Sequence, residues 1–160
     1  MSEQLRFLGS LGDYLLRRSL KHLVLHVTHH CNFRCKHCFI DFDRDRDLKL
    51  PAYLELARQT GPLFWLDIGG GEPLLRKDLA EIVIPFDASV TAIPSNGSLP
   101  DQMETQIERM RSQLDGEILI SLSLDGLAAT HDALRGEPGN FDQVWSTFER
   151  LKRLGGLSLK

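Results

Sequence analysis

The protein has 160 residues, of which 42% are hydrophobic and 26% are charged, enough to bury one core in one domain. Its net charge of -3 gives no electrostatic support for nucleic acid or an anionic membrane as a partner. No apolar run approaches the roughly 18 residues of a membrane span, and the N-terminus is too polar for a secretory signal, so we expect a cytoplasmic protein.

Strands and helices are predicted to alternate along the chain. Residues 1–20 have apolar side chains at roughly helical spacing and are predicted to form a helical lead-in, followed by a core domain over residues 21–160. Four β-rich segments are found at residues 22–28, 63–68, 89–94 and 117–125. Helical patterns follow them at residues 51–60, 76–84, 100–114 and 140–154. This alternation predicts an α/β fold with a parallel sheet.

The fourth β-rich segment has one apolar face and one face that becomes polar towards its end. Ile118, Ile120, Leu122 and Leu124 alternate with Leu119, Ser121, Ser123 and Asp125. Strands of a parallel sheet are normally apolar on both faces. The polar face therefore indicates a polar ligand near the strand end, where α/β folds place their sites. A solvent-facing edge strand would give the same pattern.

Each of the four segments ends in an unusual turn, and a parallel sheet brings these turns to one rim. The turns contain, in order, the cysteines, "GGGEP", "SNG" and "SLDG". Each motif alone is typical of an ordinary tight turn. Their expected meeting at one edge favours a shared functional site.

All three cysteines lie in "CNFRCKHC", at Cys31, Cys35 and Cys38. In a reducing compartment such a cluster indicates metal binding rather than disulfides. The spacing differs from common zinc and ferredoxin patterns, which supply four ligands. Three thiolates can hold a cubane iron–sulfur cluster and leave its fourth iron open. A Cys3His zinc site is the alternative, with His29, His30 or His37 as the fourth ligand.

The cysteine spacing at the end of a first strand resembles the radical S-adenosylmethionine (radical SAM) superfamily. Four further landmarks follow in the family's order: "GGEPLLRKDL", "SNG", "SLSLDG" and "HDALRGEPGNFDQV". They are most similar to the branch of molybdenum-cofactor cyclases, sulfatase-maturing enzymes and peptide maturases. The resemblance implies a (βα)n radical SAM barrel, of which this chain supplies about four βα units.

The resemblance also implies the roles of individual residues. Cys31, Cys35 and Cys38 would ligate a [4Fe-4S] cluster, whose open iron binds S-adenosylmethionine. The residues that would contact this cosubstrate come from all the later landmarks. Gly70, Gly71 and Glu72 match the motif whose backbone meets the methionine amino group. The other positions would contact the ribose (Ser123, Asp125), the methionine carboxylate (Arg135), the adenine through the backbone (His37) and the rim in general (Asn96).

The function implied by the resemblance is that of an enzyme that cleaves S-adenosylmethionine reductively. The resulting 5′-deoxyadenosyl radical would abstract hydrogen from a substrate, which these residues do not identify, a peptide being one class to consider. A reductant such as flavodoxin or ferredoxin would be a partner. The alternative is a truncated, non-catalytic module that holds iron–sulfur or zinc; an electron carrier is disfavoured by the missing fourth cysteine.

The chain departs from the family pattern in its length. The family core usually has six βα units, and this sequence ends with "GLSLK" where a fifth strand should begin. We expect a fragment of a longer protein, or a barrel completed by another chain, with the C-terminal strands missing. The open sheet edge predicts low solubility or self-association. Residues 41–49, which are rich in charge, are predicted to be a solvated loop.

Overall fold

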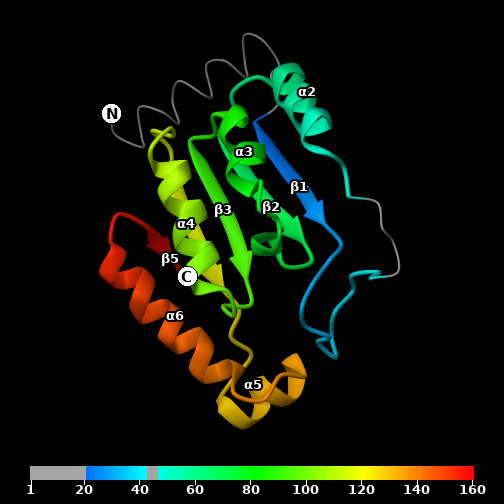
Figure 1. Cartoon of the computed structure of the whole chain (residues 1–160), viewed down its shortest axis with the longest axis vertical. Helices are drawn as coiled ribbons and strands as arrows, with labels where there is room; N and C mark the ends of the chain where they lie inside the picture. Colours follow the sequence, from blue (N-terminus) through cyan, green and yellow to red (C-terminus); the bar gives the residue numbers. More distant parts are fainter. Residues whose placement is uncertain (1–20, 43–46) are drawn as a thin grey trace.

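Five parallel strands form one sheet in the computed structural model, which describes residues 21–42 and 47–160 (Figure 1). The strands follow one another across the sheet in chain order, which confirms the predicted parallel α/β fold. Their bounds are His22–Thr28 for β1, Trp65–Gly70 for β2, Val90–Ser95 for β3, Glu117–Leu122 for β4 and Ser158–Leu159 for β5.

The helices α2, α4 and α6 agree closely with the predicted segments, whereas the predicted helix at residues 76–84 is broken. Only the short α3 is α-helical there; it begins after residues 76–78, and it is followed by a 3₁₀ turn that starts at Ile84 and contains Pro85, which cannot continue the helical hydrogen bonds. Helix α5 was not predicted. The predicted lead-in helix lies outside the described residues. The bounds are Leu50–Thr60 for α2, Leu79–Val83 for α3, Pro100–Arg111 for α4, Ala128–Arg135 for α5 and Asn140–Leu154 for α6, with 3₁₀ turns at Pro73–Leu75 and Ile84–Phe86.

A fifth strand begins in the last residues of the chain, in the segment where the sequence was expected to begin one. Ser158 pairs with Leu119 of β4, and the Lys160 amide donates to the Ile120 carbonyl at 2.9 Å. The chain therefore enters a fifth strand.

Among the described residues, the helices cover one face of the sheet and leave the other face open. Leu25 and Val27 of β1 are buried beneath the helices, whereas the intervening Val24 is 58% exposed. On β4, Ile118 and Ile120 are buried in the same way, and the predicted polar side of that strand belongs to the open face. Leu124, which was predicted on the apolar side, lies beyond the end of β4 and is exposed.

The open face carries a hydrogen-bonded carboxylate close to the beginning of the strands. Asp67 of β2 accepts a hydrogen bond from the indole nitrogen of Trp65 at 2.9 Å. Its second carboxylate oxygen lies 2.7 Å from Nε2 of His22, on the neighbouring strand β1. A carboxylate is therefore held on the uncovered side of the sheet by two ring nitrogens.

A buried polar network joins the ends of β3 and β4 to helices α5 and α6. His131 is fully buried; its Nδ1 accepts from the Asp125 amide at 3.1 Å, and its Nε2 lies 2.8 Å from the Asn140 side-chain oxygen. The Asn140 amide nitrogen donates to the Asn96 carbonyl at 3.1 Å. Because all these groups are satisfied inside the protein, the network fixes the loops after both strands. Over residues 21–42 and 47–160, no helix has the length and apolar character needed to cross a bilayer.

Replacing Asn140 by alanine should destabilise the fold, because His131 and the Asn96 carbonyl would lose partners in a buried place. We expect a loss of about 3 kcal/mol in the free energy of unfolding, measured by urea denaturation. Ser146→Ala, on the exposed side of the same helix, is the control and should change it by less than about 0.5 kcal/mol. Equal unfolding midpoints for the two variants would contradict the role given to the network.

Candidate functional site

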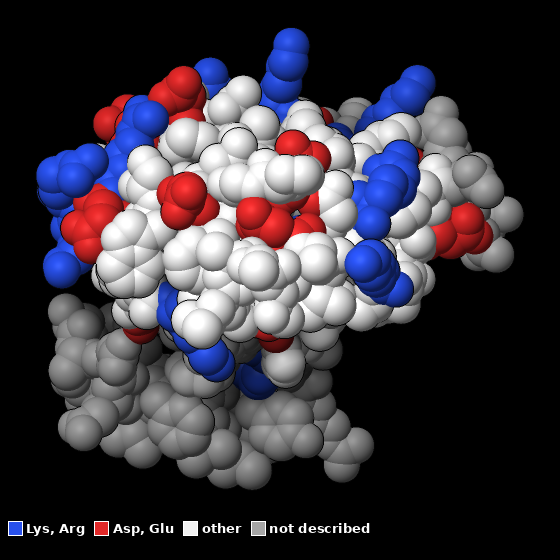
Figure 2. All heavy atoms as spheres, turned by 90° about the horizontal axis from the view of Figure 1, so that it is seen from below, with Lys and Arg blue, Asp and Glu red and all other residues white. Residues whose placement is uncertain are grey.

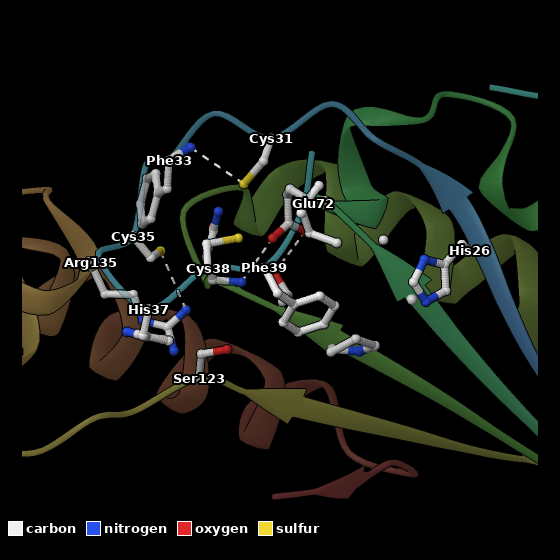
Figure 3. A pocket seen from close by; sticks show the side chains of 17 residues that line it. His26, Cys31, Phe33, Cys35, His37, Cys38, Phe39, Glu72, Ser123 and Arg135 are labelled. Carbon is white, nitrogen blue, oxygen red and sulfur yellow. Dashed lines mark hydrogen bonds between the residues drawn. The ribbon is translucent and has the colours of Figure 1, made fainter. Parts of the chain in front are cut away.

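A pocket of about 300 Å³ lies where strands β1 to β4 end, and it gathers residues from all four turns (Figure 3). Ten of the eleven residues predicted from the sequence as site residues line it. They are Cys31, Cys35, His37, Cys38, Gly70, Gly71, Glu72, Asn96, Ser123 and Arg135. The eleventh, Asp125, is placed behind Arg135 rather than on the pocket wall. The expected meeting of the strand ends is thus observed.

The three cysteines follow β1 in a loop that bends around one side of the pocket (Figure 3). The thiol of Cys31 accepts a hydrogen bond from the Phe33 amide at 3.4 Å, and the Cys38 amide donates to the Cys35 carbonyl at 3.1 Å. Burial raises the pKa of the Cys31 thiol, and the Phe33 amide only partly opposes this effect. A thiolate at this position therefore needs a positive partner, which a bound metal centre provides.

The three histidines considered as zinc ligands are all directed at carboxylates. His29 Nδ1 and His30 Nε2 lie 3.4 and 3.9 Å from the Asp47 oxygens, and His37 Nε2 lies 3.8 Å from Asp125. Within the described part of the chain, no three His, Cys, Asp or Glu side chains converge to hold a single metal ion. All three cysteines nevertheless line the same pocket.

The glycines after β2 allow two backbone segments to approach closely. The Gly71 amide donates to the Thr28 carbonyl at 2.8 Å, and the Glu72 amide donates to the His30 carbonyl at 2.9 Å. A Cβ on Gly70 or Gly71 would overlap the Thr28 or His30 carbonyl oxygen, and Gly70 also has a positive φ of 113°. Only glycine is compatible with this contact between the "GGE" turn and the segment before Cys31.

The Glu72 side chain connects the "GGE" turn to the "SNG" turn. Its carboxylate is 2% exposed and accepts from the Asn96 amide at 2.8 Å, the Ser95 hydroxyl at 3.1 Å and the Leu74 amide at 3.2 Å. Burial raises the pKa of Glu72, and these hydrogen bonds act in the opposite direction. With its oxygens occupied by three protein donors, Glu72 shapes the pocket rather than offering a free carboxylate.

The end of β4 and helix α5 supply the charged side of the pocket. Arg135 Nε lies 2.6 Å from Asp125 Oδ2, and both side chains are largely buried. Arg135 Nη1 also donates to the Cys35 sulfur at 3.9 Å. Asp125 thus orients Arg135, while Ser123 lies on the wall with its amide bonded to the Ser95 carbonyl at 3.0 Å.

Sequence reasoning missed several residues of the site. The Asn32 side chain joins the cysteine loop to the "SNG" turn. Its nitrogen donates to the Ser98 hydroxyl and its oxygen accepts from the side-chain nitrogen of Asn96, both at 2.9 Å. His26 lines the pocket from the open face of β1, with its ring over Gly69 (Figure 3). Phe39 lines it while remaining 86% exposed. The alternation of β1, at positions 22, 24 and 26, could have identified His26 as an open-face residue.

Charges of both signs are interspersed at the end of the molecule where the strands finish. Figure 2 shows this end with a largely uncharged centre that contains a few Asp and Glu side chains, and with Lys and Arg mostly towards the rim.

Proteins with known functions match most of this chain. An S-adenosylmethionine-dependent nucleotide dehydratase of Selenomonas ruminantium is 38% identical over 135 residues, which are 81% of this chain and 48% of that protein. The pre-heme d1 synthase of Dinoroseobacter shibae is 31% identical over 140 residues, 83% of this chain and 34% of that protein. The chain thus spans between a third and a half of the length of these relatives.

Solved structures share the fold. Streptococcus suis SuiB bound to S-adenosylmethionine has a TM-score of 0.70 and 21% identity, covering 94% of this chain and 36% of SuiB. The same protein bound to its precursor peptide SuiA has a TM-score of 0.68. Residues 25–158 match the sequence profile of the radical SAM superfamily. With this match over most of its length, the chain belongs to the radical SAM superfamily.

Proposed function

We propose that the pocket at the strand ends binds a [4Fe-4S] cluster together with S-adenosylmethionine, as part of a radical SAM enzyme. The observation that supports this most is the convergence of the cysteines, the "GGE" turn, Ser123 and Arg135 on one pocket. When bound, the reduced cluster and S-adenosylmethionine supply a 5′-deoxyadenosyl radical that abstracts hydrogen from the substrate. The chain's own residues bind, orient and shield these groups.

The donors available in the pocket suit these two groups. Three thiols without a fourth protein ligand would hold a cluster by three irons, leaving one iron for the cosubstrate. The backbone of Gly70 and Gly71 would meet the methionine ammonium, and Arg135 would pair with its carboxylate. Ser123 would contact the ribose, while Asn96 and the His37 backbone would border the adenine side.

The same geometry supports the cluster over the zinc alternative. His29 and His30 are directed at Asp47, and His37 is directed at Asp125, so each candidate fourth ligand faces a carboxylate. Zinc in a structural site needs four ligands converging at bond distance. A cubane cluster instead needs three thiolates around one space, and the presence of all three cysteines on one pocket supports this choice.

The substrate and the reductant are proposals at the level of class. SuiB, which shares the fold, binds a precursor peptide, so a peptide is the first substrate class to test. Other relatives act on nucleotides or form heme d1 precursors, and these classes are the next to test. A reductant such as flavodoxin or ferredoxin would supply the electron.

Anaerobic reconstitution with iron and sulfide should give a brown protein with about four irons per chain. Adding S-adenosylmethionine should change the electron paramagnetic resonance (EPR) spectrum of the reduced cluster. The chain has no other cysteines, so the iron content reports on these three alone. Replacing each of them by serine should reduce the iron bound by several fold.

Two results would contradict the proposal in different ways. A colourless protein that binds one zinc would show that the cysteines belong to a Cys3His zinc site and not to an iron–sulfur cluster. A cluster whose EPR spectrum is insensitive to S-adenosylmethionine would instead support a non-catalytic module.

Replacing Glu72 by glutamine should destabilise the site, because the amide nitrogen would face the Asn96 amide at a buried position. We expect a loss of about 2 kcal/mol in the free energy of unfolding, measured by urea denaturation of the metal-free chain. Glu81→Gln removes a carboxylate from an exposed ion pair with Arg109 and should cost less than about 1 kcal/mol. If Glu72→Gln were no more damaging than this control, Glu72 would not be a structural link between the two turns.

A further inference from the structure

The segment from Thr28 to His30, directly before Cys31, is held between two partners. On one side its carbonyl groups accept from the Gly71 and Glu72 amides. On the other side its donors are directed at Asp47, which follows 19 positions after Thr28. The position of the first cysteine relative to the "GGE" turn is therefore set by both contacts.

Asp47 contacts this segment through both carboxylate oxygens. Oδ2 accepts a short hydrogen bond from the Thr28 hydroxyl, and Oδ1 accepts from the His29 amide at 2.8 Å. The Thr28 hydroxyl in turn accepts from the His30 amide at 3.0 Å. Burial acts to raise the pKa of Asp47, but the hydrogen bonds from Thr28 and His29 outweigh it and lower the pKa. The carboxylate thus orders three successive residues before Cys31.

Arg76 also connects the backbone before the cysteine loop to the backbone after it. Its Nη1 donates to the Val27 carbonyl at 3.2 Å and to the Leu48 carbonyl at 3.0 Å. Its remaining nitrogens pair with Asp78 at 2.7 and 2.9 Å, which keeps the guanidinium in place. Asp47 and Arg76 therefore both connect the end of β1 to residues 47–48, which follow the cysteine loop. Asp47 does so through its carboxylate and Arg76 through its guanidinium.

We propose that Asp47, acting through the Thr28 hydroxyl, is a positioning residue that fixes Cys31 against the "GGE" turn and so aligns the cluster with S-adenosylmethionine. This inference rests on the proposed cluster site. Asp47 touches neither group; it acts on the segment that connects Cys31 to β1. Replacing residues that orient metal ligands without touching the metal commonly lowers metal affinity by about 10–100-fold. The charged run at 41–49, predicted to be a solvated loop, thus contributes at least one largely buried carboxylate.

The test compares two substitutions of Thr28 in the full chain. Thr28→Val removes the hydroxyl and keeps a similar shape, whereas Thr28→Ser keeps the hydroxyl. In the reconstituted protein, Thr28→Val should lose iron to a ferrous chelator about 10-fold faster than the wild type. Thr28→Ser should remain within about 2-fold of it. The EPR response to S-adenosylmethionine should weaken in Thr28→Val and persist in Thr28→Ser. Asp47→Asn should behave like Thr28→Val, and the double variant should add little to either.

Two further measurements separate positioning from general destabilisation and from failure of the proposed function. Glu104→Gln weakens an ion pair with Arg150, between helices α4 and α6, and should leave iron loss unchanged. In the metal-free chain, alkylation mapped by mass spectrometry should show Cys31 reacting faster relative to Cys38 in Thr28→Val. If the wild type binds no iron but the alkylation of Cys31 still changes in Thr28→Val, the positioning role of Asp47 is supported and the cluster proposal is contradicted. If iron loss, the EPR response and alkylation in Thr28→Val all equal those of the wild type, the positioning role of Asp47 is contradicted.

Discussion

The close backbone approach between the end of β2 and the segment before Cys31 is the contact on which the site depends. Two amide-to-carbonyl hydrogen bonds, from Gly71 to Thr28 and from Glu72 to His30, bring the turn that would hold the cosubstrate against the loop that would hold the cluster. Side chains on Gly70 or Gly71 would exclude this approach. Glu72 then extends the connection to the turn after β3, so three strand ends form one unit.

The fourth strand end joins this unit by a different kind of contact. Buried His131 links the Asp125 amide to Asn140, which holds the Asn96 carbonyl. Helix α5 therefore positions Arg135 beside the cysteine loop while its own His131 fixes the loop after β4. The pocket is thus formed by polar contacts between turns, whereas the apolar core beneath the sheet only sets the spacing of the strands.

Much of this arrangement could be predicted from the sequence, because strand alternation and the parallel topology together place distant motifs on one rim. The cysteines and the "GGE" turn were found in this way, whereas Arg135 was identified only through the family resemblance. What could not be predicted depended on tertiary contacts. Asp47 and Asn32 look like ordinary loop residues until their partners are known, and helix α5 has too short a periodic pattern to be recognised. The pairing of Asp125 with Arg135 is a further tertiary contact that the sequence does not reveal.

The open face of the sheet carries a carboxylate near the beginning of the strands. Asp67, held by His22 and Trp65, lies on the uncovered side with about a third of its side chain accessible. A carboxylate is strongly disfavoured against a dry apolar layer. The open face of the sheet is therefore mixed in character near the beginning of the strands, because the exposed Val24 of β1 is the strand partner of Asp67.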